Sequence, residues 1–101
     1  MRAQVHSIDF SASDRLLDFV QQRVDKLDQF YDRIVGKEIY LRLVKSQDTA
    51  NKVAELKLNI PGKELFAKKQ CKTFEEATDN AVEAIRKQLT KHKGKIIKKA
   101  A

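Results

Sequence analysis

Apolar and polar residues recur with two different periods along this chain, and the period changes near Gly36. Before that glycine, apolar side chains return every three or four positions, which is the spacing of an amphipathic helix. Ser13 can cap the free N–H groups of the first turn, and Asp14 complements the positive end of the helix dipole. The pattern therefore predicts a helix over residues 14–31. Its apolar stripe consists of Leu16, Val20, Val24, Leu27 and Tyr31.

A period of two predicts strands in much of the remaining chain. The candidate strands cover residues 2–10, 39–44, 53–60 and 65–72. Turn signals stand between the last three of them, at the polar residues 46–49 and at Pro61-Gly62-Lys63-Glu64. Consecutive strands with such short connections should form an antiparallel meander, with one face packed and the other open to water.

A second amphipathic helix follows Thr73, which with Glu76 forms a capping box. We expect this helix to run to about Lys93 and to end near Gly94. The order β-α-β-β-β-α, with two amphipathic helices and one sheet to cover, predicts an α+β two-layer sandwich. Both helices should pack on one face of a four-stranded sheet. The length fits one domain, which we place at residues 1–95, followed by a basic C-terminal tail at 96–101.

The basic residues are concentrated at one end of the chain. The formal net charge is +7, and the last sixteen residues carry seven basic side chains and no acidic one. Residues 1–85 therefore carry no net charge. A concentrated positive field attracts polyanions. The alternative interpretation is a solvated, Lys-rich tail that aids solubility.

Charges on the first helix are segregated into two flanks, at 100° per residue. The acidic flank consists of Asp14, Asp18, Asp25, Asp28 and Asp32, and the basic flank of Arg15, Arg23, Lys26 and Arg33. The acidic flank can also be explained by basic partners elsewhere in the fold, such as Lys68 or Lys69. If the basic flank lies beside the basic end of the second helix, together they make one positive cleft that binds phosphates with little regard to sequence.

Other chemistries find little support in the residues. Cys71 is the single cysteine, and no glycine-rich phosphate loop or nucleophile–histidine–acid arrangement is evident. We therefore expect no enzyme activity, no cofactor and no metal. His92 should be partly buried rather than a ligand. No apolar stretch is long enough to span a bilayer and no signal-peptide pattern stands at the N-terminus, so we expect a cytoplasmic protein. With few aromatic residues, contact with structured RNA through phosphates fits best.

Two parts of the chain, taken together, resemble a known family. Residues 13–20 (SDRLLDFV) and 26–34 (KLDQFYDRI) resemble the first helix of the bacterial ribosome hibernation-promoting factors, also called ribosome-associated inhibitors or sigma-54 modulation proteins. Residues 86–95 (RKQLTKHKGK) are similar to the end of that family's second helix, and Asp79 matches an acidic position in it. The resemblance covers essentially the whole chain.

This resemblance implies a fold related to double-stranded RNA-binding domains and a specific partner. Members bind the small ribosomal subunit in the channel for messenger and transfer RNA and stop translation in stationary phase, as a stress response. The resemblance also implies that ribosomal RNA is contacted by Arg23, Lys26, Lys87, Lys91 and Lys93. Arg86 and Lys95, from the same basic run, complete the predicted RNA-binding set. We expect a monomer off the ribosome, with no membrane and no small-molecule substrate among its partners.

Three hypotheses of function remain open at this point. The first is a ribosome-binding inhibitor that acts by occupying the channel. The second is a general basic RNA-binding module or RNA chaperone. The third is a regulatory factor that binds another protein through the acidic flank of the first helix.

Overall fold

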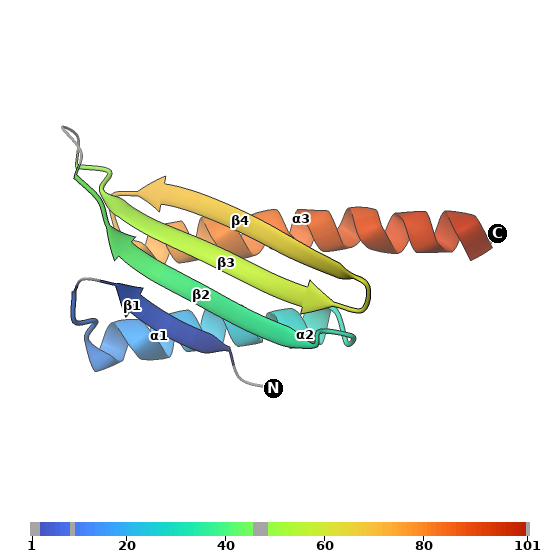
Figure 1. Cartoon of the computed structure of the whole chain (residues 1–101), viewed down its shortest axis with the longest axis horizontal. Helices are drawn as coiled ribbons and strands as arrows, with labels where there is room; N and C mark the ends of the chain where they lie inside the picture. Colours follow the sequence, from blue (N-terminus) through green and yellow to red (C-terminus); the bar gives the residue numbers. More distant parts are fainter. Residues whose placement is uncertain (1–2, 9, 46–48, 101) are drawn as a thin grey trace.

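The computed structural model describes residues 3–8, 10–45 and 49–100, with side chains described as far as His92 (Figure 1). Within this part of the chain the elements follow the predicted order, apart from one division of the first helix. They are β1 (Gln4–Ile8), α1 (Asp14–Asp25), α2 (Leu27–Phe30), β2 (Gly36–Leu43), β3 (Lys52–Ile60), β4 (Lys63–Cys71) and α3 (Phe74–Ala100). The predicted turn at 46–49 falls mainly on residues 46–48, which lie outside the described residues.

The four strands form one sheet in the order β1-β2-β3-β4. β2, β3 and β4 are antiparallel neighbours, which confirms the predicted meander. β1 pairs with β2 in parallel, with Val5 opposite Ile39. Parallel neighbours need a crossover connection, and α1 and α2 provide it. At the tight end of the meander, Gly62 has a φ of 76°, a left-handed conformation that glycine adopts without steric cost.

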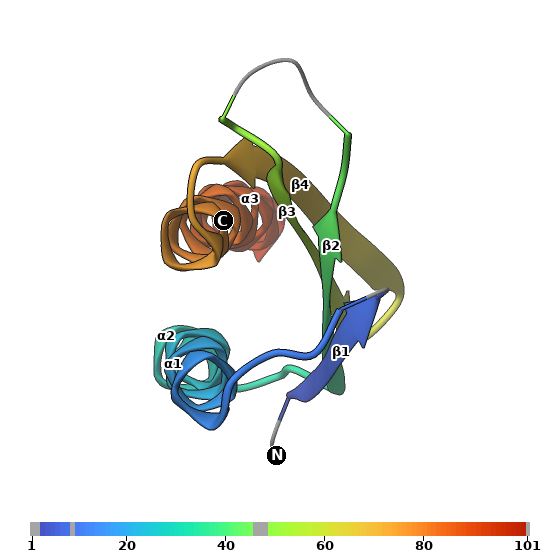
Figure 2. The ribbon, with the colours of Figure 1, turned by 90° about the vertical axis from the view of Figure 1, so that its left-hand side faces the viewer.

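Both helical segments cover the same face of the sheet, so the molecule has the two layers expected (Figure 2). The core between the layers is apolar and fully buried, with Leu56 and Leu58 from β3, Val24 from α1, and Ile85 and Leu89 from α3. The predicted α+β sandwich is thus confirmed. The opposite face of the sheet is open, as expected for an antiparallel meander.

Both helix starts use the caps predicted from the sequence. The Ser13 hydroxyl accepts a hydrogen bond from the Leu16 N–H at 3.1 Å, and the Thr73 hydroxyl accepts one from the Glu76 N–H at 3.1 Å. The first helix, expected to be continuous over residues 14–31, is interrupted at Lys26. The Lys26 N–H donates a hydrogen bond to the Gln22 carbonyl at 3.2 Å and another to the Val24 carbonyl. These bonds form a tightened turn, which separates α1 from α2.

The prediction that the second helix ends near Gly94 is wrong, because α3 continues to Ala100. Figure 1 shows it reaching beyond the end of the sheet. A glycine inside a helix costs about 1 kcal/mol relative to alanine, far less than proline. The residues that follow are Lys, Ile and Ala, without a proline to stop the helix. The backbone of residues 96–100 therefore continues α3, while a separate role for a tail at 96–101 stays a prediction.

Candidate nucleic-acid interface

α1 and α3 lie side by side and run in the same direction. Arg23 of α1 meets Asp79 in the first half of α3, and Phe30 of α2 meets Arg86 further along α3. The contacts thus follow the same order in both helical segments. The basic half of α3 therefore begins beside α2, as the positive cleft requires, whereas the end of α1 lies beside the acidic first half of α3.

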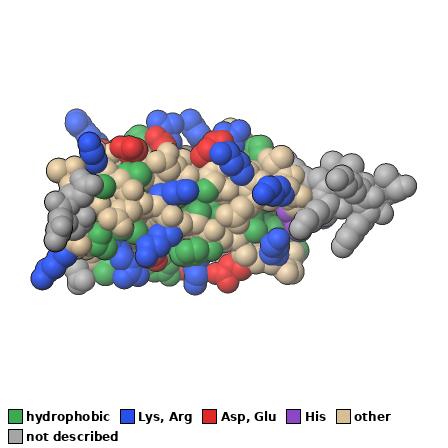
Figure 3. Space-filling view, turned by 90° about the horizontal axis from the view of Figure 1, so that it is seen from above, with side chains coloured by type: hydrophobic (Ala, Val, Ile, Leu, Met, Phe, Trp, Pro, Cys, Tyr) green, Lys and Arg blue, Asp and Glu red, His purple; other side chains and the backbone are tan. Residues whose placement is uncertain are grey.

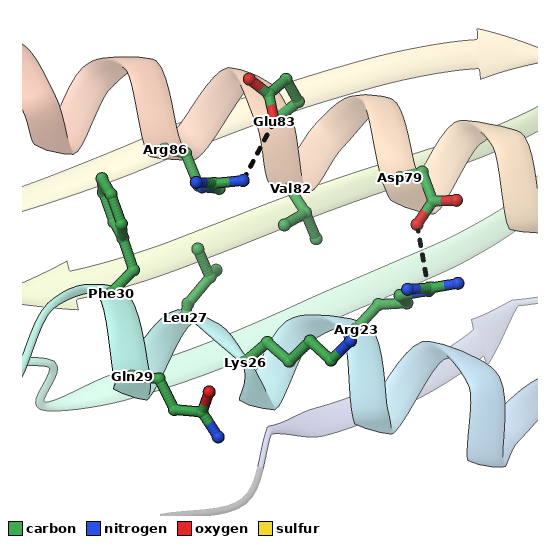
Figure 4. Close-up of a pocket in the computed structure, with 9 residues that line it drawn as sticks. All are labelled: Arg23, Lys26, Leu27, Gln29, Phe30, Asp79, Val82, Glu83 and Arg86. Carbon is green, nitrogen blue, oxygen red and sulfur yellow. Dashed lines mark ion pairs between the residues drawn. The ribbon is translucent and has the colours of Figure 1, made fainter.

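Between the two helical segments lies a cleft of about 540 Å³, which we call the interhelical cleft (Figure 4). It is lined by Arg23, Lys26, Leu27, Gln29, Phe30, Asp79, Val82, Glu83 and Arg86. Leu27 and Val82 form part of its apolar floor. Three basic side chains surround this floor, but two acidic side chains of α3 stand among them. The cleft is therefore positive, and less so than the basic residues alone suggest.

The two arginines of the interhelical cleft are held by similar contacts. The Arg23 guanidinium lies 4.7 Å from the centre of the Phe19 ring, and its Nε lies 3.3 Å from Asp79 Oδ1. The Arg86 guanidinium lies 4.9 Å from the centre of the Phe30 ring, with Nη1 3.5 Å from Glu83 Oε2. Figure 4 shows both ion pairs. An aromatic ring beneath a guanidinium restricts its orientation.

A second hollow, of about 380 Å³, continues the surface along α3. It is lined by Phe30, Glu83, Arg86, Lys87, Thr90 and Lys91. At 100° per residue, Lys87 points about a quarter turn away from Arg86, toward the side of β4. A third hollow, of about 320 Å³, accordingly joins Lys87 to Lys69 of β4. Seen from above, Lys and Arg side chains are spread over the surface with Asp and Glu among them (Figure 3).

The acidic flank of α1 has a structural partner at the sheet. The Lys37 side chain of β2 is fully buried, and its Nζ lies 2.9 Å from Asp25 Oδ1 and 2.6 Å from Asp28 Oδ2. Asp25 also accepts hydrogen bonds from the Ala3 N–H and from Gln21 Nε2, both at 2.9 Å. The structural explanation of the acidic flank therefore holds for these two aspartates, with Lys37 as the partner instead of Lys68 or Lys69.

This cluster changes the acidity of Asp25. Burial raises the pKa of Asp25, but the hydrogen bonds from Gln21, Lys37 and Ala3, with the positive charge of Lys37, outweigh it. The pKa of Asp25 therefore lies below its ordinary value, and the carboxylate form is favoured. Asp25 therefore has a structural role, and the positive charge of Lys37 compensates its negative charge.

The open face of the sheet carries a separate group of polar contacts. The His6 and Tyr40 rings stack with their centres 4.7 Å apart, and the Tyr40 hydroxyl donates a hydrogen bond to Glu38. This hydrogen bond raises the pKa of Tyr40. The described members of the predicted RNA-binding set come from the helical layer, so the two faces of the molecule can be altered independently.

Comparison with known proteins identifies the family. The family model described as "Sigma 54 modulation protein / S30EA ribosomal protein" matches residues 3–97 of the chain. The chain belongs to this family. A relative from Klebsiella oxytoca named ribosome hibernation promoting factor is 32% identical over 91 residues, which are 90% of this chain and 90% of the relative. The resemblance drawn from the helix motifs is thus confirmed.

Two solved structures share the fold of the family. A ribosomal subunit interface protein from Coxiella burnetii superposes with a TM-score of 0.80 at 17% identity, covering 93% of this chain and 99% of that protein. The N-terminal domain of Protein Y from Thermus thermophilus superposes with a TM-score of 0.76 at 19% identity, covering 91% of this chain and 99% of that domain. At these identities the likeness establishes the shared fold.

The structure places the predicted RNA-binding residues in three groups. Arg23, Lys26 and Arg86 line the interhelical cleft. Lys87 and Lys91 line the adjoining hollow on α3, so the expected single cleft is instead a surface that passes over the helix. Lys93 and Lys95 belong to α3 by their backbone, and their side chains lie outside the described residues.

Sequence reasoning missed the rings beneath the two arginines. Phe19 precedes Arg23 by four residues, and side chains at that spacing meet on a helix, so this pair has a local signal. Phe30 and Arg86 are distant in sequence and only the tertiary register joins them. His92 was expected to be partly buried, which is confirmed, and its ring centre lies 6.3 Å from that of Tyr31 in an edge arrangement.

Other kinds of site find no support in the described part of the chain. No group of three or more His, Cys, Asp or Glu side chains among the described residues is arranged to hold a metal ion. None of the described helices is long and apolar enough to cross a membrane. Cys71 is a free, partly buried thiol, and its sulfur accepts a hydrogen bond from Asn80 Nδ2 at 3.3 Å.

Proposed function

We propose that this chain is a ribosome hibernation factor, which binds the small ribosomal subunit in the channel for messenger and transfer RNA and inhibits translation by occupying it. The role is non-catalytic and cytoplasmic. The family and the names of its relatives support ribosome association. The observation that carries the proposal is the convergence of basic side chains from α1, the turn at Lys26 and α3 on one continuous surface.

The chemistry of this surface suits ribosomal RNA. Lys and Arg side chains replace the cations condensed around phosphates, which gives affinity without base reading. The guanidinium groups of Arg23 and Arg86 add planar donors suited to phosphate oxygens. The proposed RNA contacts are Arg23, Lys26, Arg86, Lys87, Lys91, Lys93 and Lys95. Off the ribosome the protein is proposed to be a monomer.

The binding test compares two pairs of neutralised lysines in a pelleting assay with purified small subunits. Lys87→Gln/Lys91→Gln removes two charges from the proposed surface. The control, Lys57→Gln/Lys68→Gln, removes two charges from the open sheet face, where Lys57 and Lys68 lie opposite Phe66 and Glu55. Both variants should keep the circular dichroism spectrum of the folded protein, because all four side chains are wholly or partly exposed.

We expect the Lys87/Lys91 variant to bind more weakly, with a log–log salt slope smaller in magnitude by about 1.4 to 1.8, since each lost phosphate contact contributes about 0.7 to 0.9. The control should lose much less. Equal losses for both variants would show that binding depends on overall charge and that the surface is wrongly assigned. Recovery of the wild-type protein from lysates only with free RNA would favour a general RNA-binding module instead. Recovery only with a soluble protein would favour a regulatory factor.

A further inference from the structure

Two carboxylates stand inside the cleft that is proposed to bind phosphates. Asp79 and Glu83 are four residues apart on α3, so they lie on the same face of that helix. Each is paired with an arginine of the cleft, at 3.3 Å for Asp79 and 3.5 Å for Glu83. A surface that gained affinity only from positive charge would be stronger without them.

These ion pairs contribute little to folding stability. The side chains of Arg23 and Asp79 are 42% and 51% exposed, and those of Arg86 and Glu83 are 50% and 56% exposed. Exposed pairs of this kind are strongly screened by water and salt. The stability gained from these ion pairs therefore does not account for two acidic residues at this place.

The pairs do fix the direction of the guanidinium groups. The Nε of Arg23 faces Asp79, and the Arg23 guanidinium lies over the Phe19 ring. A guanidinium carries five N–H donors in a rigid fork, so the edge formed by the two terminal nitrogens stays available to an incoming phosphate. Arg86 lies over the Phe30 ring and turns a terminal nitrogen, Nη1, toward Glu83, which leaves its other N–H groups available to a phosphate.

We propose that Asp79 and Glu83 are specificity-determining residues, which weaken the attraction of the interhelical cleft for flexible polyanions while they hold Arg23 and Arg86 ready for phosphates at fixed positions in a folded RNA. This inference rests on the proposed function. A flexible strand is attracted mainly by the summed charge, which each carboxylate lowers by one unit. A folded RNA that presents its phosphates at the right positions also gains from donors that are already oriented.

The test measures selectivity, defined as the affinity for purified small ribosomal subunits divided by the affinity for polyuridylate, a flexible single strand. Asp79→Asn and Glu83→Gln are compared with the wild-type protein. Asp18→Asn is the matched control, because it removes the same charge from an exposed position on the acidic flank of α1. Asp79→Glu is the conservative variant that keeps the carboxylate.

Each of the two cleft variants should bind polyuridylate about two- to fivefold more tightly, the range given by one unit charge at about 10 to 4 Å in water. Their affinity for small subunits should stay the same or fall, so selectivity drops by at least the same factor. Asp18→Asn and Asp79→Glu should keep the wild-type selectivity.

An equal gain for both ligands, or a loss of selectivity in Asp18→Asn as large as in Asp79→Asn, would overturn the inference and leave the proposed function standing. Failure of the wild-type protein to bind small subunits at all would instead overturn the proposed function, and the inference with it.

Discussion

The buried ammonium group of Lys37 should make the fold respond unequally to removal of either side of its ion cluster. The Lys37 side chain has no exposed surface, whereas those of Asp25 and Asp28 are 29% and 37% exposed. Changing both aspartates to asparagine leaves a positive charge in the interior without an ionic partner. Removal of one side of a buried ion pair costs about 3–5 kcal/mol.

Changing Lys37 to methionine should cost less. Both carboxylates then remain beside water, and Asp25 still accepts hydrogen bonds from the Ala3 N–H and from Gln21. The lost contacts correspond to about 1–2 kcal/mol, in the lower part of the range for a polar group that loses its hydrogen-bond partner. The triple variant, with Lys37→Met added to the two asparagines, should be more stable than the double variant, because it removes the stranded charge.

Urea unfolding followed by circular dichroism gives the free energies of unfolding of all four proteins by linear extrapolation. A domain of this size has a total stability of about 5–15 kcal/mol, so a loss of 3–5 kcal/mol is large and easily measured. A cost for Lys37→Met that equals or exceeds that of the double asparagine variant would refute the reasoning. A triple variant less stable than the double variant would refute it as well.

Two further predictions concern acidity and the cleft. Because the pKa of Asp25 lies below its ordinary value of 3.8 in the folded protein, its contribution to stability is complete above that value and is lost as the pH falls through the folded pKa. Thermal melts from pH 6 to pH 2 should therefore show a smaller acid-induced loss of stability in Asp25→Asn than in the wild-type protein. Equal losses of stability in the two proteins would contradict this. Phe30→Leu removes the ring under Arg86 and should weaken small-subunit binding about two- to fivefold, the size of an exposed cation–π contact. The pelleting assay should show this weaker binding, while the circular dichroism spectrum stays unchanged. Binding as tight as that of the wild-type protein would show that the ring does not position Arg86.

Much of the fold can be predicted from the sequence, because the buried face of each helix or strand requires apolar residues at the repeat of that element. Ala54, Leu56 and Leu58 are all fully buried, as their alternation predicts. The same alternation places Lys37 on the buried face with Ile39 and Leu41, so the pattern contained the signal for a buried lysine. The break at Lys26 and the continuation of α3 through Gly94 were not predictable in this way, since a tightened turn and a tolerated glycine leave the apolar period unchanged.

The candidate site was only partly predictable for a different reason. Helix periodicity assigns Arg23 and Lys26 to one flank of the helix predicted over residues 14–31, and their positions in the interhelical cleft agree with it. Whether Arg86 or Lys87 turns toward that cleft depends on how α3 is rotated on the sheet, which packing decides. The contact of Arg86 with Phe30 follows from that rotation and has no local sequence signal.

The length of α3 sets a limit on how far its charges can compensate one another. From Glu75 and Glu76 in the first turn to Lys91 the helix rises by about 23 Å, at 1.5 Å per residue. The Debye length at physiological ionic strength is about 8 Å, so the acidic start of the helix is separated from Lys91 by nearly three screening lengths. A polyanion near Lys91 therefore responds to the charges close to Lys91. Neither the acidic residues at the other end of the helix nor the net charge of +7 describes this local charge. At physiological ionic strength the charges at the two ends of α3 are therefore largely screened from each other.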